Sequence, residues 1–136
     1  MGKPRAFISF DFDNNKIDRG LFVGQIKNSL TPFQVEDWSS KKRLPQKDWE
    51  ELINNKINRC NILIVLVGKN TYKAPRVIKE IIFSRNNKVP IFGVYVDGAN
   101  TMTRLPSGLQ RNRTISWTWH KISSAINQCM KELKNR

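Results

Sequence analysis

The feature that most restricts the fold of this chain is an uninterrupted aliphatic run from Ile62 to Val67. The run shows neither the alternation of a half-exposed strand nor the spacing of an amphipathic helix, and it is rich in β-branched side chains. Such a run is typical of a strand buried on both faces, as found in parallel sheets that helices cover on each side. The sequence therefore predicts an α/β protein with this run near the centre of its sheet.

Strand and helix patterns alternate around this run. Apolar β-rich segments predict further strands at 6–10, 33–38 and 89–96 and an edge strand at 114–117. Apolar residues at helical spacing predict helices over 18–30, from Trp49 to Cys60, from Pro75 through Ile82, and from Trp119 onward. In the first of these, Leu21 and Phe22 are expected on one apolar face, and in the third the apolar stripe is Val77, Ile78, Ile81 and Ile82. The segment 97–112 has the composition of a loop.

This order implies one domain over residues 1–136, since the chain is too short to build a second core. Strands that alternate with helices join a parallel sheet through right-handed crossovers. For five strands at this length we expect a flavodoxin-like three-layer sandwich with the strand order 2-1-3-4-5.

The net charge of +13 first indicates a nucleic-acid binder. Residues 1–40, however, hold five basic and five acidic residues, so the excess lies in the later helices and loops. This distribution favours a basic exterior around a mixed-charge site, which would attract an anionic ligand or an acidic partner. The chain also has no recognisable reading helix or RNA-binding motif, so nucleic acid ranks last among the partners considered.

We expect a cytoplasmic protein without a membrane segment. The N-terminus lacks the apolar stretch of a signal peptide, and the longest apolar run is far shorter than a bilayer span. Cys60 and Cys129 stand alone in the sequence, which favours reduced core thiols over a disulfide.

In an open parallel sheet, ligands bind beyond the carboxyl ends of the strands, where the strand order reverses. Three predicted loops begin there, after Phe10, Asp37 and Gly68. Turn formation by the Asp-Asn cluster and capping by Ser39 or Thr71 are the structural alternatives to ligand contact. The candidate binding residues in these loops are Asp11, Asp13, Asn14, Trp38, Ser39, Lys69, Asn70, Thr71 and Tyr72.

Several other site chemistries are not encoded. The sequence has no glycine-rich phosphate loop, and the acidic residues after the first strand would repel the phosphate of a flavin. A receiver-type phosphorylation site would need an aspartate after Val67, where the chain has Gly68 and Lys69. The single histidine, His120, lies far from the strand ends, so we expect no metal site and no histidine-based triad.

Glu80 is the only acidic residue between Glu51 and Asp97. Helical geometry places it about 60° from Val77, at the edge of the apolar stripe of its helix. The structural interpretation is a flanking residue paired with Arg76 one turn earlier. The functional interpretation is a site carboxylate.

A series of short motifs covers almost the whole sequence. In order along the chain they are Phe7–Asp11, Pro32–Phe33, Asp37–Ser39, Trp49, Ile64–Gly68 with Thr71, Glu80 and Trp117–Trp119. This pattern resembles the TIR-like domains of bacteria and archaea, which include the TIR-like component of the Thoeris anti-phage system. Each motif is short, and their order and spacing carry the resemblance. The helix of Glu80 lacks the Ser, Trp and Cys features of many TIR domains.

The resemblance implies a domain that binds NAD as substrate, without a further cofactor, and cleaves the bond between nicotinamide and ribose. The product can be a cyclic ADP-ribose isomer that signals in anti-phage defence. Glu80 matches the catalytic glutamate, since an oxocarbenium-like state needs a nearby carboxylate. Phe10, Trp38 and Tyr72 would stack on the rings. The other residues expected at the substrate are Asp11, Asp37, Ser39, Lys69 and Thr71, with Lys41 and Lys42 near the diphosphate.

Two other functions stay open. Many TIR relatives are scaffolds, so the chain can be a non-catalytic module that associates with itself or with other chains. The second alternative is the basic nucleic-acid binder suggested by the net charge.

Overall fold

The protein is described from a computed structural model that covers residues 4–11, 14, 17, 20–22, 34–38 and 46–132, with the backbone alone at 34–38 and 46. The strands are β1 (Arg5–Ser9), β2 (Gln34–Trp38), β3 (Ile62–Val67), β4 (Ile91–Tyr95) and β5 (Thr114–Ile115). The helices are α2 (Gln46–Asn58), α3 (Pro75–Asn86) and α4 (Trp119–Lys131), with two short 3-10 helices, η1 (Thr71–Lys73) and η2 (Arg111–Arg113). Of the helix expected at 18–30, residues 20–22 are described, and they are helical.

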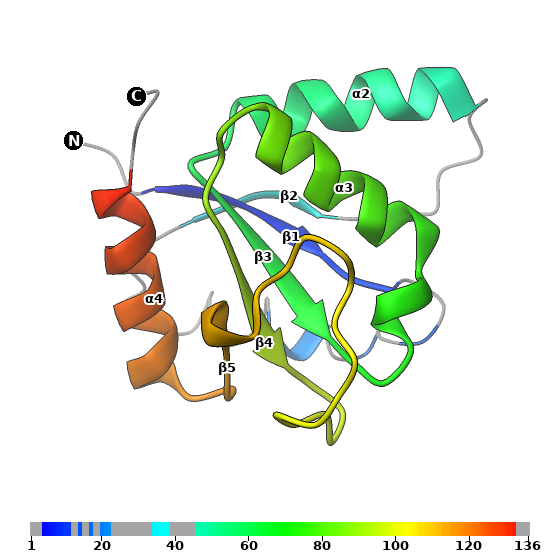
Figure 1. Cartoon of the computed structure of the whole chain (residues 1–136). Coiled ribbons are helices and arrows are strands. Elements are labelled where there is room, and N and C mark those ends of the chain that lie inside the picture. Colours follow the sequence, from blue (N-terminus) through cyan, green and yellow to red (C-terminus); the bar gives the residue numbers. More distant parts are fainter. Residues whose placement is uncertain are drawn as a thin grey trace.

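All strand pairs are parallel, and the strands lie in the order β2-β1-β3-β4-β5 (Figure 1). The predicted α/β class with a parallel sheet is confirmed. Each of the six residues of β3 is buried, because β1 and β4 flank the strand and helices cover both of its faces. The aliphatic run identified in the sequence is therefore the centre of the molecule.

Two apolar clusters fill the space on the two sides of the sheet. Ile8, Ile64 and Val94 point toward α4, where they meet Ile122 and Ile126. The alternate residues of the same strands point to the opposite side and pack against α2 and α3. This alternation follows from strand geometry, since successive side chains point to opposite faces.

The stripe of α3 differs from the expectation. The sequence pattern predicted Val77, Ile78, Ile81 and Ile82 as the inward residues, but Ile82 is 43% exposed. The buried residues are instead Val77, Glu80, Ile81 and Ser84. Two polar residues can occupy the core face because each has a hydrogen bond there, Glu80 with Ser9 and Ser84 with the carbonyl of Val89.

Two smaller differences concern a helix end and a helix face. Cys60, expected in the second helix, lies just beyond the end of α2 and is still fully buried. Leu21 was expected on the same apolar face as Phe22, but it is 61% exposed while Phe22 is fully buried.

The connection from β4 to β5 contains no α-helix, although parallel strands are usually joined through one. This segment, residues 96–113, passes over the α3 side of the sheet (yellow to orange in Figure 1). Leu109 is buried in the cluster under α2 and α3, and Leu105 packs against it. The loop predicted at 97–112 thus covers this part of the sheet, as a helix does elsewhere in the fold.

Candidate functional site

The candidate site is centred on a carboxylate buried at the carboxyl end of the sheet. Ser9, the last residue of β1, donates a hydrogen bond from its Oγ to Glu80 Oε1 at 2.6 Å. Both residues are 0% exposed. The interpretation of Glu80 as a residue at the flank of the apolar stripe is wrong, because the side chain lies inside the protein. The guanidinium of Arg76 lies 4.6 Å from the centre of the Trp49 ring.

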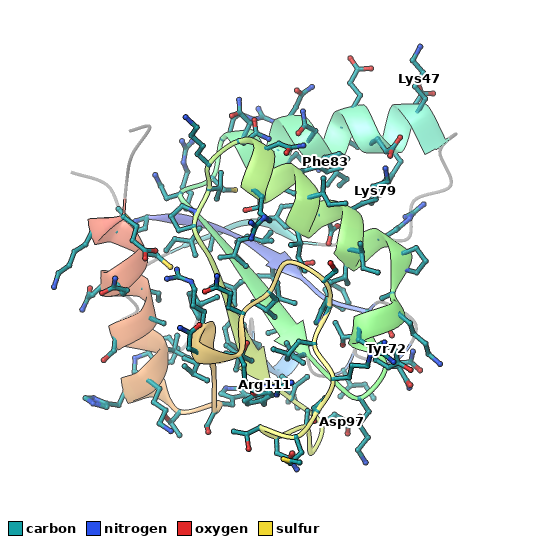
Figure 2. The ribbon with its side chains drawn as sticks, viewed as in Figure 1. Lys47, Tyr72, Lys79, Phe83, Asp97 and Arg111 are labelled. Atoms are coloured by element: carbon teal, nitrogen blue, oxygen red, sulfur yellow. The ribbon has the colours of Figure 1, made fainter. Side chains whose placement is uncertain are left out.

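The local sequence explains how these two side chains meet. In β1, Phe7 and Ser9 point to the side of α2 and α3, whereas Ile8 and Phe10 point to the other side. On α3, Glu80 follows Val77 by three residues, so both face the sheet. Salt bridging between Lys79 and Glu50 at 2.8 Å and ring contact between Phe83 and Trp49 hold α3 against α2 (Figure 2).

The turn after β3 sets the start of α3. The backbone N–H of Gly68 donates to Thr71 Oγ1 at 2.8 Å, and Thr71 is fully buried. Thr71 therefore stabilises the turn that leads through η1 into Pro75, the first residue of α3. This geometry matches the turn-capping alternative for Thr71.

Cations line the outside of this end of the sheet. Tyr72 is half-buried in η1, and the guanidinium carbon of Arg104 lies 4.7 Å from the centre of its ring. Lys69 and Lys73 are exposed on the same turn. Figure 2 shows Tyr72 at the end of the molecule to which the strand arrows of Figure 1 point. A negatively charged ligand that approaches this end meets positive charge before it meets Glu80.

The candidates after β1 are held by local structure. Asp11 is 7% exposed and accepts a hydrogen bond from Asn14 Nδ2 at 2.6 Å, while Asn14 N–H bonds to the Asp11 carbonyl. These bonds match the turn alternative for this cluster. Phe10 is 2% exposed and packs with Ile8 and Phe22 on the side of the sheet away from Glu80.

The candidates after β2 are placed only by their backbone. Asp37 pairs in register with Phe7, and Trp38 with Ile8, so the carboxyl ends of β1 and β2 lie side by side. Ser39, Asp13, Lys41 and Lys42 lie outside the described residues.

Two residues that touch this region were not predicted as site residues. Ser9 interrupts an otherwise apolar strand, and a lone hydroxyl in such a run was a usable signal for a buried polar contact. Arg104 gave no local signal, because only the path of the 96–113 segment brings it to Tyr72.

Within the described part of the chain, no group of three or more His, Cys, Asp or Glu side chains could hold a metal ion. None of the helices described there is long and apolar enough to cross a membrane. The buried ionisable side chain at this end of the sheet is a carboxylate that accepts a hydrogen bond from a hydroxyl.

A parallel sheet in the order β2-β1-β3-β4-β5 with helices on both faces defines a flavodoxin-like α/β domain. The family model described as "Thoeris protein ThsB, TIR-like domain" matches residues 7–101, more than half of the chain, and the protein belongs to this family. The expected TIR-like resemblance is therefore confirmed.

A solved structure supports the fold independently. The chain is similar to the TIR domains in a structure of the activated Roq1 resistosome, which directly recognises the pathogen effector XopQ. The TM-score is 0.52 at 13% sequence identity, over 97% of this chain and 71% of the other. At this identity the similarity shows the fold alone. Among curated proteins, no match to this sequence was found.

Proposed function

We propose that this protein cleaves NAD at the bond between nicotinamide and ribose, with Glu80 as the catalytic carboxylate. The observation that carries the proposal is the position of Glu80, buried at the carboxyl end of the sheet and bonded to Ser9 Oγ at 2.6 Å, in a chain of the ThsB TIR-like family. The choice of this reaction rests on the resemblance to catalytic TIR domains.

In this reaction the C1′–N bond breaks, its electron pair stays on the nicotinamide nitrogen, and positive charge develops on the ribose. A carboxylate next to the ribose stabilises that charge. Attack of water on C1′ gives ADP-ribose and a proton, whereas attack by a nucleophilic atom of the same molecule gives cyclic ADP-ribose or an isomer of it, also with release of a proton. The cyclic isomer would serve as a messenger in anti-phage signalling in the cytoplasm.

The remaining site residues would bind the substrate. Lys69 and Arg104 carry charge suited to a diphosphate, and the Tyr72 ring offers a stacking surface. Ser9 would be a positioning residue that holds the carboxylate in one orientation. Asp37 and Trp38, at the neighbouring carboxyl end of β2, would also contact the substrate.

Because Glu80 is 0% exposed in the single chain, turnover requires a rearrangement that opens a path to it. We propose that association with further copies, or with another chain, provides this opening. The Roq1 TIR domains belong to an assembled resistosome, which gives this step a structural parallel.

The test is release of nicotinamide from NAD, measured by liquid chromatography and mass spectrometry in dilute solution and under crowding that promotes association. Glu80→Gln should lower the rate by on the order of a hundredfold or more. Ser9→Ala should lower kcat by about tenfold with little change in KM. The matched control is Glu51→Gln, which removes an exposed carboxylate from α2. Equal rates for the parent and folded Glu80→Gln would remove Glu80 from the mechanism.

A second candidate function is a non-catalytic interaction module. Ile17 and Leu21 lie one helical turn apart and are 79% and 61% exposed, a pair of apolar side chains suited to a protein contact. This function predicts no nicotinamide release in any state of association. It also predicts that Ile17→Asp weakens association, which analytical ultracentrifugation would measure.

A further inference from the structure

A cavity of about 600 Å³ lies at the amino end of β4, the end of the sheet opposite to Glu80. It opens between the end of α3, the residues before η2, and the end of α4. It exists because β5 has only two residues, which pair with Gly93 and Val94 and leave Ile91 and Phe92 without a partner strand on the β5 side. Its volume is within the range of small-molecule sites, about 300–1,000 Å³.

The cavity has an excess of positive charge. Three cations line it, Arg85, Lys88 and Arg113, with a single acid, Glu132. Glu132 is already neutralised, because both of its oxygens accept hydrogen bonds from Arg113, at 2.7 and 2.8 Å. Among the described residues, neither Arg85 nor Lys88 has an ion-pair partner. Arg85 is anchored over the cavity by a hydrogen bond to the Gly108 carbonyl at 3.2 Å.

Lys88 occupies a backbone position that favours glycine. The end of α3 is a Schellman motif, in which Val89 N–H bonds to the Ser84 carbonyl at 2.9 Å and Lys88 N–H bonds to the Arg85 carbonyl at 3.1 Å. Lys88 has φ +58°, a conformation that costs energy for any residue with a Cβ. A lysine there turns its charged side chain into the wall of the cavity at a conformational cost that glycine would avoid. This cost points to a role of the Lys88 side chain beyond ending the helix.

We propose that this cavity binds a small phosphorylated molecule of about nucleotide size. Arg85 and Lys88 would bind the phosphates, since charge-assisted hydrogen bonds to phosphate are the strong ones. Val89, Pro90 and Leu109 provide an apolar floor for the ring of the same ligand. The site lies at the opposite end of the sheet from Glu80, so it is separate from the proposed NAD site and does not depend on it.

The experiment is a titration of the full-length ¹⁵N-labelled chain with ADP at low salt, followed by amide chemical shifts. We expect saturable shifts at Val89, Ile91 and Leu109. Lys88→Gln and Arg85→Gln should each raise the dissociation constant for ADP by about tenfold. Adenosine, which lacks phosphate, should bind at least about tenfold more weakly. Lys47→Gln is the matched control, because it removes an exposed lysine at the far end of α2 (Figure 2).

Lys88→Gly separates a binding role from a folding role. It should weaken ADP binding as much as Lys88→Gln does, while the unfolding temperature stays equal or rises by a few degrees. The proposal is overturned if ADP shifts only the amides around Ser9 and Thr71, if Lys47→Gln weakens binding equally, or if no saturable shift occurs.

Discussion

Single residues in this protein are constrained by what touches them on the far side of the fold. Glu80 shows this most clearly, since its environment is set by Ser9, 71 positions earlier in the chain. A buried carboxylate needs a hydrogen-bond donor, because burial without one carries a large desolvation cost. The short contact with Ser9 satisfies Oε1 of Glu80 and restricts the direction in which the carboxylate points.

Gly108 is constrained in two ways, by its backbone and by its surroundings. It has φ +93°, and a Cβ built on it would lie 2.8 Å from Ile81 Cγ2. Gly108→Ala should therefore lower the free energy of unfolding by about 2–4 kcal/mol, from backbone strain and overpacking together. Urea unfolding followed by tryptophan fluorescence measures this loss.

Gly98 is the control for that substitution. It has φ +76° but nothing within 4 Å of an added Cβ. Gly98→Ala should cost about 1 kcal/mol, the backbone part alone. Equal losses for the two variants would show that the contact with Ile81 does not restrict position 108.

Cys129 makes the stability depend on pH in the alkaline range. Burial raises the pKa of the Cys129 thiol from 9.0 to about 11, and the nearby Arg113 opposes this shift. The folded protein therefore holds the proton more tightly than the unfolded chain. Its contribution is fully present below pH 9 and is lost as the pH rises to about 11, by no more than about 3 kcal/mol. Between pH 8 and 11, the free energy of unfolding measured in urea should fall less for Cys129→Ala than for the parent protein. If the free energies of the two proteins fell in parallel with pH, Cys129 would not be the cause.

Between elements, Arg113 is the main polar connection. Its Nε donates to the Ile91 carbonyl at 2.8 Å, and both terminal nitrogens bind Glu132. The hydrogen bond to Glu132 raises the pKa of the guanidinium. One side chain thus ties η2 to the start of β4 and to the end of α4, where β5 is too short to do so.

Arg113→Lys keeps the charge and loses the forked geometry. We expect the free energy of unfolding to fall by about 1–2 kcal/mol, because an ammonium cannot serve both the carboxylate and the Ile91 carbonyl. A double-mutant cycle with Glu132→Gln, measured in urea, should give a coupling energy of about 1 kcal/mol. Additive losses would mean that the two residues act independently.

Over the whole molecule, stability should be highest at the centre of the sheet. In β3, Leu63, Ile64 and Val65 pair with both β1 and β4, whereas β5 pairs only with β4, through Thr114 and Ile115. Amide hydrogen exchange should therefore be slowest in β3, at the rate of global unfolding. It should be much faster in residues 97–110, where a loop covers the sheet in place of a helix. Equal protection in both regions would contradict this ranking.

At the scale of the whole molecule, the structure also shows where part of the excess positive charge lies. Cations lie at both ends of the sheet, Lys69, Lys73 and Arg104 near the candidate NAD site and Arg85 and Lys88 at the opposite cavity. The sequence predicted attraction of an anionic ligand, and the structure provides two places where such a ligand would meet positive charge.

The sequence by itself determined the class of fold. The side chains of the Ile62–Val67 run can be buried on both faces of a strand only between two layers of helices. The order of apolar patterns along the chain predicted the alternation of strands and helices. These signals are local, since burial on both faces and helical spacing are written in consecutive residues. They also carried the resemblance that the match over residues 7–101 confirmed.

Only the tertiary structure decided which polar residues are buried and what they meet. Glu80 read as a flanking residue because its pattern on α3 is compatible with solvent, and its burial depends on a hydroxyl from a distant strand. The contact of Arg104 with Tyr72 and the cavity beside Lys88 likewise depend on how the 96–113 segment crosses the sheet. Periodicity records whether a side chain prefers water, but a hydrogen bond formed across the fold can override that preference.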